Sequence, residues 1–261
     1  MKVLLTNDDG YQALGLRIVA SVLKEKFDEV YIVAPEVQQS STGGSFPGKG
    51  RWEKTTFDGM EMVWVSGTPA DAAELAGEIY GSDFEYVFSG MNMGSNVGSI
   101  PASGTMGAAN HALEKAIAKK GLVFSWRVPE SLWDKSASDV PLEKYLDYPT
   151  QTVRRLIDLA LENNLWGGEL LNFNVPESKP TKLRICEPSK QAYKEYYAYT
   201  LVVDHKKHTY QKIGADPRHL TGNLNSDANA LSQGYATVVP WLANRYVNEE
   251  LLKLIGTEIT L

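Results

Sequence analysis

The sequence predicts an α/β protein, with a three-layer core around a mostly parallel sheet and a β-rich C-terminal arm. The apolar run from Val3 to Leu5 has no polar alternation, as expected of a parallel strand covered on both faces. A helical pattern over Leu14 to Phe27 and a strand-like segment at Glu29 to Ala34 complete a βαβ opening. After Pro176 the β-prone segments follow one another with no obvious helix between them. Together these patterns give the predicted fold class.

Most of the remaining elements continue the α/β pattern. Asp58-Gly59 is a strong hairpin signal, and Thr68 before Pro69 is a good helix start. A Ser/Gly-rich loop fills the interval from Pro35 to Gly50. The predicted strands are Arg51 to Phe57, Glu61 to Ser66, Phe84 to Ser89, Gly121 to Trp126 and Glu169 to Val175. The predicted helices are Thr68 to Tyr80, Ser103 to Lys119 and Thr150 to Asn163.

The C-terminal part differs in character, and we divide the chain into a catalytic core at residues 1–176 and an arm with a return segment at 177–261. Strands are expected at Thr181 to Glu187, Tyr193 to Val203 and Thr209 to Ile213, with a hydrophilic tip at Asp204 to His208. A strand at Tyr235 to Val239 and a helix at Asn244 to Ile255 then return to the core. An isolated two-stranded ribbon is marginal in water, so the arm is expected to pair between subunits.

Composition limits the class of partner. The chain has 261 residues, 43% hydrophobic and 22% charged, which suffices for a full core. A formal net charge of -6 argues against a dedicated binder of nucleic-acid duplexes or membranes and favours small molecules. The sole cysteine, Cys186, is interpreted as a core residue and not a nucleophile. No stretch resembles a signal peptide or a membrane span, so we expect a cytoplasmic protein.

Two acids follow the first strand directly. Asp8 and Asp9 lie past its end, where a turn can bring both carboxylates toward one point, and ligands of parallel sheets bind at this edge. Two close carboxylates repel each other unless a cation lies between them. The simpler interpretation is a turn at Asp9-Gly10 with Asp8 capping the next helix. The position of the pair favours a metal site without excluding that alternative.

Further polar groups are expected at the same edge. Ser40 follows the second strand, and Asn92 lies in the loop predicted from Gly90 to Gly98. The helix beginning at Ser103-Gly104-Thr105 can offer free N–H groups to a phosphate, although the same residues also make a good cap. Hard oxygen ligands beside such a helix end suit Mg²⁺ or Mn²⁺ acting on a phosphate. No histidine pattern typical of zinc and no hydrolase nucleophile elbow is present, so neither chemistry is expected.

Several stretches, in one order, resemble the SurE family of stationary-phase survival proteins, which are metal-dependent nucleotidases. The first group comprises LLTNDDG at Leu4 to Gly10, VAP at Val33 to Pro35 and GTPAD at Gly67 to Asp71. The second comprises SGMNMGSNVG at Ser89 to Gly98, SGTMGAA at Ser103 to Ala109, NVP at Asn174 to Pro176 and QGYATVVPW at Gln233 to Trp241.

The resemblance implies a Rossmann-like core and a set of functional residues. It places the metal ligands, for Mg²⁺ or Mn²⁺, at Asp8, Asp9, Ser40 and Asn92. It further implies a phosphatase for nucleoside 5′-monophosphates, also acting on 3′-monophosphates and short polyphosphate, and a homodimer or homotetramer formed through an exchanged C-terminal arm. We expect Asp8 and Asp9 to be catalytic. The residues expected to bind the substrate phosphate are Asn96, Ser103, Gly104 and Thr105.

The chain also departs from the family pattern. Gln39 and Ala102 replace an arginine and a tyrosine that are usual beside the substrate, and the segment Trp126 to Tyr148 is atypical. A non-catalytic sensor of nucleotides or polyphosphate is therefore the alternative function. Within the enzyme hypothesis, Asp8 is the favoured residue to manage the proton, and direct attack by a carboxylate is a competing chemistry.

Overall fold

The computed structural model describes residues 1–98, 101–132, 140–162, 165–197, 200–213, 219–242, 253 and 256–260. The strands are β1 (Lys2–Thr6), β2 (Glu29–Pro35), β3 (Trp52–Phe57), β4 (Met60–Val65), β5 (Phe84–Met93), β6 (Ala118–Trp126), β7 (Leu170–Val175), β8 (Lys182–Ile185), β9 (Thr200–Asp204), β10 (Thr209–Ile213), β11 (Ala236–Trp241) and β12 (Glu258–Thr260). The α-helices are α1 (Leu14–Lys26), α2 (Pro69–Tyr80), α3 (Gly104–Glu114), α4 (Thr150–Glu162) and α5 (Asp227–Ser232).

Within the described residues the main sheet has ten strands in the order β12-β8-β11-β7-β6-β5-β1-β2-β4-β3. The six central strands, in the order β7-β6-β5-β1-β2-β4, are parallel to one another. The antiparallel pairs of the main sheet lie toward its two edges, where β3 pairs with β4, β11 with β7 and β12 with β8. The predicted α/β class with a mostly parallel sheet is confirmed.

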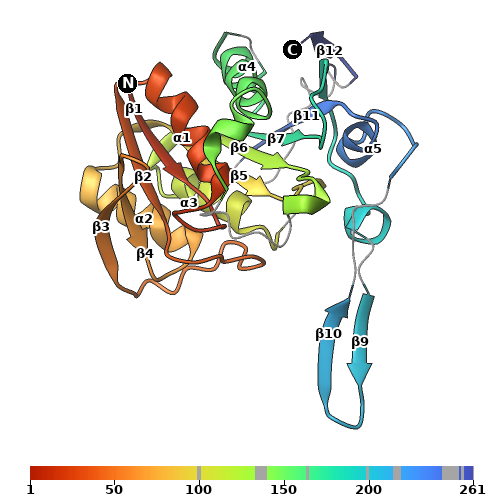
Figure 1. The fold of residues 1–261 in the computed structure, drawn as a ribbon, viewed down its shortest axis with the longest axis horizontal. Coiled ribbons are helices and arrows are strands. Elements are labelled where there is room, and N and C mark those ends of the chain that lie inside the picture. The colour runs from red at the N-terminus through yellow and green to blue at the C-terminus, as the bar shows by residue number, and fades with distance from the viewer. Residues whose placement is uncertain are drawn as a thin grey trace.

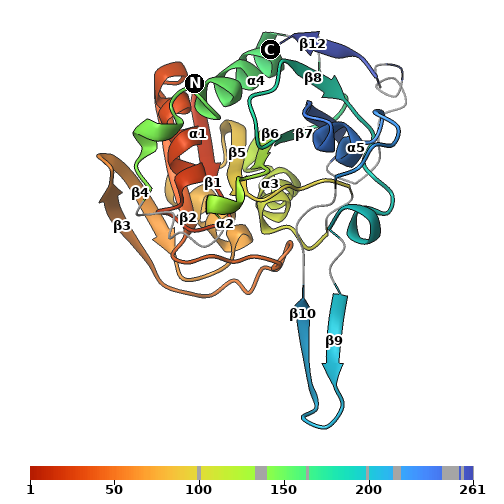
Figure 2. The same cartoon turned by 45° about the vertical axis from the view of Figure 1, so that its right-hand side comes forward.

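Helices cover both faces of this sheet, as Figures 1 and 2 show. The apolar sides of α1 and α4 form one core with one face of the strands. The apolar sides of α2, α3 and α5 form the second core with the other face. Because β1 is covered on both faces, Val3, Leu4 and Leu5 are all fully buried, which explains the absence of alternation in its sequence. None of the helices within the described ranges is long and apolar enough to cross a membrane.

Two of the predicted boundaries near the site are wrong. β5 continues past Ser89 to Met93, because after an irregularity Asn92 pairs with Ser125 of β6. Gly90 makes this possible, since a Cβ there would lie 2.2 Å from the Phe124 carbonyl oxygen. The helix expected to reach Lys119 ends at Glu114, and Ala118 instead begins β6 by pairing with Phe84 of β5. Tertiary pairing thus overrides local helix propensity.

The C-terminal part joins the core more closely than the sequence indicates. β8, β11 and β12 extend the main sheet, so the predicted boundary at residue 176 falls between two strands of one sheet. Residues Tyr193–Tyr197 form a π-helical turn where a strand was predicted. The turn forms because Tyr196 is buried in a small cluster with Val97 and Leu231. The helix predicted at Asn244 to Ile255 lies outside the described residues.

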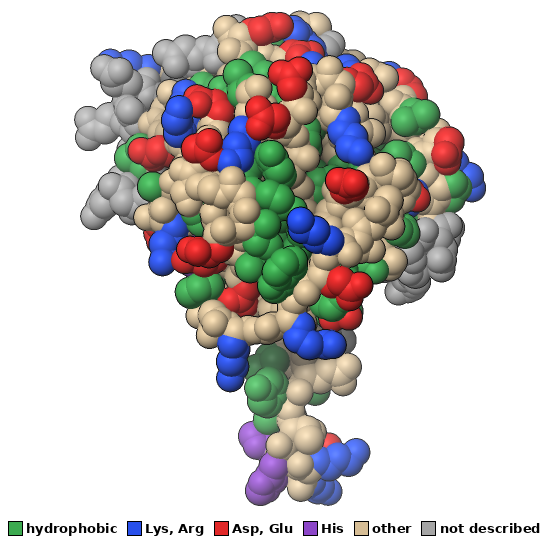
Figure 3. All heavy atoms as spheres, turned by 90° about the vertical axis from the view of Figure 1, so that its left-hand side faces the viewer, with side chains coloured by type: hydrophobic (Ala, Val, Ile, Leu, Met, Phe, Trp, Pro, Cys, Tyr) green, Lys and Arg blue, Asp and Glu red, His purple; other side chains and the backbone are tan. Residues whose placement is uncertain are grey.

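The arm is a two-stranded ribbon of β9 and β10 that stands away from the body. Figure 3 shows hydrophobic side chains on its shaft and histidine and basic side chains at its tip. Val202 and Val203 are 46% and 49% exposed, and adjacent strand residues point to opposite faces. Side chains on both faces of the ribbon are therefore exposed in the described part of the chain.

Candidate functional site

The site is built where the strand connections change direction. From β1 the chain passes to β2 on one side, and later to β5 on the other side of β1. The carboxyl ends of these three parallel strands meet at one edge, which is the usual location of ligand sites in open α/β sheets. Asp8 and Asp9 follow β1 at this point, so the topology agrees with the sequence-based prediction that the two acids lie at the carboxyl edge of the sheet.

Asp8 is held by two other segments. The Thr105 hydroxyl, in the first turn of α3, donates to Asp8 Oδ1 at 2.6 Å. The Gln39 backbone N–H, from the loop after β2, donates to the Asp8 carbonyl oxygen at 2.7 Å. The side chain lies against α3, because a Cβ at Gly104 would come within 2.8 Å of the Asp8 Cβ. Asp8 is only 4% exposed, and its carboxylate has a fixed orientation.

Asp9 joins the end of β5 to the same point. The Met93 backbone N–H donates to Asp9 Oδ2 at 2.8 Å, and the Gln38 amide donates to Oδ1 at 3.4 Å. The residue is half-buried. Through these hydrogen bonds the two acids connect the loop after β2, the end of β5 and the N-terminus of α3.

Both carboxyl groups resist ionisation in the protein alone. Burial, and then the charge of Asp9, raises the pKa of Asp8 to about 7, although the Thr105 hydroxyl partly opposes the shift. Burial also raises the pKa of Asp9, against the lowering effects of the Met93 N–H and the Gln38 amide. A divalent cation between the two acids would offset both costs, because it favours the charged carboxylates.

The other two predicted ligands lie beside these contacts. Ser40 is exposed and directly follows Gln39, whose N–H contacts Asp8. Asn92 is half-buried and directly precedes Met93, whose N–H contacts Asp9. The Asn92 amide nitrogen donates to the Gly94 carbonyl at 2.7 Å, which leaves Oδ1 as its ligand atom. The residues next to Ser40 and Asn92 in the chain therefore donate backbone hydrogen bonds to the acid pair.

The residues present fit a hard divalent cation. Two carboxylates, an amide oxygen and a hydroxyl are the donors that Mg²⁺ and Mn²⁺ accept, and the acid pair supplies the compensating charge. No cluster of three or more His, Cys, Asp or Glu residues occurs within the described ranges, so the set depends on Ser40 and Asn92 as neutral ligands. These assignments remain predictions.

Of the predicted phosphate residues, Gly104 and Thr105 lie against Asp8, and the side chains of Ser103, Thr105 and Asn96 already have protein partners. Ser103 is the N-cap of α3, and its Oγ accepts from the Met106 N–H at 3.1 Å. Thr105 donates to Asp8, and the Asn96 amide donates to Ser125 Oγ at 2.9 Å. Ser103 only accepts in this cap, so its hydroxyl hydrogen can still be donated to a phosphate. The N–H groups of Gly104 and Thr105, which have no partner within the helix, are the other donors.

Sequence reasoning did not identify two asparagines that support the site. Asn172 and Asn174 lie in β7, are fully buried, and both donate to the Asn96 carbonyl at 2.8 Å. Buried asparagines cost free energy unless they are paired, so a strand that carries them is unusual. The sequence feature that could have identified them is their alternate spacing in the otherwise apolar LLNFNV, which places both side chains on one face of the strand.

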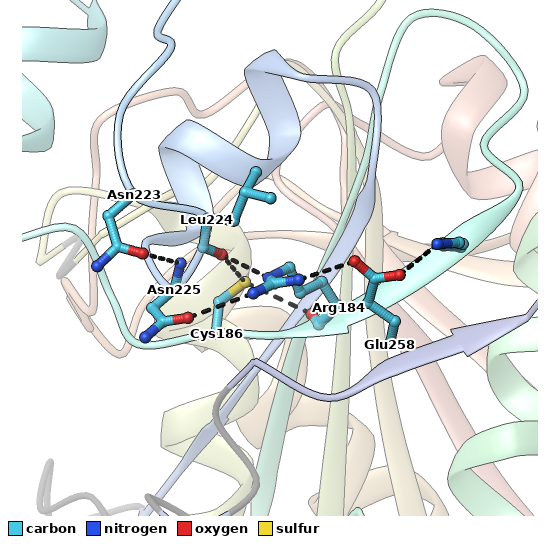
Figure 4. A network of polar contacts seen from close by, with 7 residues as sticks. Arg184, Cys186, Asn223, Leu224, Asn225 and Glu258 are labelled. Atoms are coloured by element: carbon cyan, nitrogen blue, oxygen red, sulfur yellow. Dashed lines mark hydrogen bonds and ion pairs between the residues drawn. The ribbon is translucent and has the colours of Figure 1, made fainter.

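Cys186 is a structural residue, as predicted from its sequence context. It is 1% exposed, and burial raises the pKa of its thiol. Figure 4 shows its thiol beside Arg184, which connects β8 to β12 and to the loop before α5. Arg184 Nε donates to the Leu224 carbonyl at 2.8 Å, and Nη1 pairs with Glu258 at 2.9 Å. These contacts fix the segment that leads into α5.

The close contact at Gly104 gives a testable prediction. A Cβ there would lie 2.8 Å from the Asp8 Cβ and 3.0 Å from Oδ2, so Gly104→Ala must displace the carboxylate. We expect weaker Mn²⁺ binding by about tenfold, measured by calorimetric titration. Gly44→Ala is the control, because no described residue outside its chain neighbours would lie within 4 Å of a Cβ there. Equal Mn²⁺ affinity in the two variants would contradict the assigned position of Asp8.

The fold, with Asp8 and Asp9 directly after β1, defines an α/β protein with a carboxylate-based candidate cation site beside a helix N-terminus. The family model described as "Survival protein SurE" matches residues 3–196. The chain therefore belongs to the SurE family.

Curated relatives agree with this assignment. The chain is 36% identical over 251 residues to the 5′-nucleotidase SurE of Chloroflexus aggregans, covering 92% of each chain. It is 34% identical to that of Clostridium botulinum, with the same coverage, and 30% identical to that of Archaeoglobus fulgidus, covering 92% of this chain and 90% of the relative. The crystal structure of SurE protein from Aquifex aeolicus matches with a TM-score of 0.68 at 22% identity over 97% of both chains, which supports the fold.

Proposed function

We propose that this protein is a divalent-metal-dependent phosphatase that hydrolyses nucleoside 5′-monophosphates, with 3′-monophosphates and short polyphosphate as further substrates. The Thr105–Asp8 hydrogen bond of 2.6 Å carries the proposal, because it joins a helix N-terminus that suits phosphate to an acid pair that suits a cation. The relatives named 5′-nucleotidase SurE support the nucleotide as substrate. A cytoplasmic location, expected from the sequence, belongs to the same proposal.

Each group in the site has a definite task in this chemistry. Asp8, Asp9, Ser40 and Asn92 would hold Mg²⁺ or Mn²⁺, which when bound stabilises charge on phosphoryl oxygens and makes a water more acidic. The N–H groups of Gly104 and Thr105 bind a phosphate oxygen and orient the ester. Thr105 occupies one lone pair of Asp8 Oδ1, so the carboxylate keeps lone pairs both for the cation and for a proton from the attacking water.

The decisive experiment measures phosphate release from a panel of nucleoside monophosphates with Mn²⁺, with Mg²⁺ and with EDTA. The proposal predicts release that requires a divalent cation and returns when the cation is restored. A protein that binds nucleotide in the same buffers without releasing phosphate would be the non-catalytic sensor. Because Gln39 and Ala102 replace residues that the family resemblance places beside the substrate, the panel also tests base preference.

We further propose that two or four copies assemble through the β9–β10 arm. The apolar face of the ribbon carries Leu201, Val203 and Tyr210, which are 55%, 49% and 76% exposed. Tyr210 lies directly opposite Val203, so these side chains form one continuous surface. A second copy of the chain offers the same surface in a matching orientation.

A further inference from the structure

The loop Ser95–Gly98, which follows the site, is buried although it has no regular secondary structure. Three of its consecutive backbone N–H groups are satisfied by side chains from distant segments. The Asn96 N–H donates to Asn174 Oδ1 at 2.7 Å, the Val97 N–H to the Tyr197 hydroxyl at 3.0 Å, and the Gly98 N–H to Asp227 Oδ2 at 2.7 Å. The loop conformation is therefore set by side chains outside it.

The carbonyl groups of the loop are held in the same way. The Tyr197 hydroxyl donates to the Ser95 carbonyl at 2.7 Å, so this one hydroxyl bridges the backbone on both sides of Asn96. The Asn96 carbonyl accepts from Asn172 and Asn174. Because both flanking peptides are fixed, the Asn96 side chain has little freedom to turn.

The groups that hold the loop are themselves anchored. Asp227, at the start of α5, is fully buried, and its Oδ1 accepts from the Ser189 N–H at 2.9 Å and from the Ser189 hydroxyl at 2.6 Å. The Arg184 contacts drawn in Figure 4 fix the loop just before Asp227. Tyr197 ends the turn that precedes the arm, three residues before β9 begins.

The Asn96 side chain leads directly to the catalytic acid. Its amide nitrogen donates to Ser125 Oγ at 2.9 Å and to Thr105 Oγ1 at 3.4 Å. Because the Thr105 oxygen accepts from Asn96, its hydroxyl hydrogen points to Asp8 Oδ1, 2.6 Å away. A displacement of Asn96 would release the Thr105 hydroxyl to rotate away from Asp8.

We propose that Tyr197 and Asp227 are positioning residues that fix the Ser95–Gly98 loop, and that this loop orients Asp8 through Asn96 and Thr105. The proposal rests on the function proposed above for the same site. It extends that function to two residues whose described hydrogen bonds to this region go to the Ser95–Gly98 loop. Because Tyr197 lies at the base of the β9–β10 arm, the same segment then serves both subunit assembly and the positioning of Asp8.

The test is a double-mutant cycle between Tyr197→Phe and Thr105→Val. Tyr197→Phe removes only the bridging hydroxyl, and we expect kcat to fall about tenfold with KM for nucleotide nearly unchanged. The Mn²⁺ dissociation constant, measured by calorimetric titration, should rise in parallel. In the Thr105→Val background Tyr197→Phe should cause no further loss, because the connection to Asp8 is already absent.

Tyr196→Phe is the matched control. Its hydroxyl donates at 3.0 Å to the side-chain oxygen of Ser95 and not to the loop backbone, so we expect a similar loss of thermal stability with unchanged kcat and Mn²⁺ affinity. Asp227→Asn provides a second, independent variant at Gly98, with the same expected fall in kcat and Mn²⁺ affinity.

Two results would overturn the positioning role. One is that Tyr197→Phe and Tyr196→Phe have the same kcat and the same Mn²⁺ affinity. The other is that the effects of Tyr197→Phe and Thr105→Val on kcat and Mn²⁺ affinity multiply fully in the double variant. If the wild-type protein releases no phosphate, the proposed function fails. The Mn²⁺ cycle then still decides whether Tyr197 acts on Asp8.

Discussion

Asp8→Asn and Asp9→Asn should each lower divalent-dependent phosphatase activity by about a hundredfold or more, without unfolding the protein. Each change removes one charge from the candidate cation site, while the asparagine oxygen can still accept from Thr105 or Met93. Since burial raises the pKa of both acids, the neutral side chain should leave the metal-free protein as stable as before or slightly more stable.

Thermal unfolding with and without Mn²⁺ separates loss of the site from loss of the fold. A ligand at a hundred times its dissociation constant stabilises a protein by about 2.7 kcal/mol, and this gain should disappear in both variants. Asp28→Asn is the control, because Asp28 is exposed at the opposite edge of the sheet. Near-normal turnover of both variants at saturating Mn²⁺ would remove Asp8 and Asp9 from the site.

The sequence predicts well those elements whose burial is uniform. β1 is apolar because both of its faces are covered, and the edge where Asp8 and Asp9 lie follows from its position alone. It predicts poorly those segments whose structure depends on distant partners. The pairing of Ala118 with Phe84 ends α3 early, and the burial of Tyr196 makes a helical turn from a tyrosine-rich segment.

The same distinction applies to the site. The acid pair is visible in the sequence because it directly follows a strand, whereas the support of Asp8 by Thr105, Asn96 and Tyr197 spans residues that are about a hundred positions apart along the chain. The sequence predicts both a phosphate site and a helix cap at Ser103, and the structure shows the cap, in which the Ser103 hydroxyl accepts from the Met106 N–H. Local patterns therefore identify chemical groups more readily than the contacts that orient them.

The β9–β10 ribbon should be the principal contact between subunits. Its two strands bury little of each other, since Val202 and Val203 are both about half exposed on opposite faces. A ribbon of this kind is marginal in water unless a further surface covers it. We expect the native protein to sediment as a dimer or tetramer at micromolar concentration, and a monomer at that concentration would refute the assembly.

Replacing residues 200–213 with a short Gly/Ser linker should give a monomer, because it removes the proposed subunit contact. A short linker can span the gap, because Thr200 and Ile213 pair at the base of the ribbon. This replacement keeps Tyr196 and Tyr197, so the protein should retain more activity than one lacking Tyr193 to Ile213.

Leu201→Glu with Val203→Glu should also dissociate the subunits, since both charges fall on the apolar face beside Tyr210. Lys206→Glu with Lys207→Glu, at the exposed tip, is the charge-changing control and should leave assembly intact. If the linker variant still sediments as a dimer, the subunit contact lies on the core.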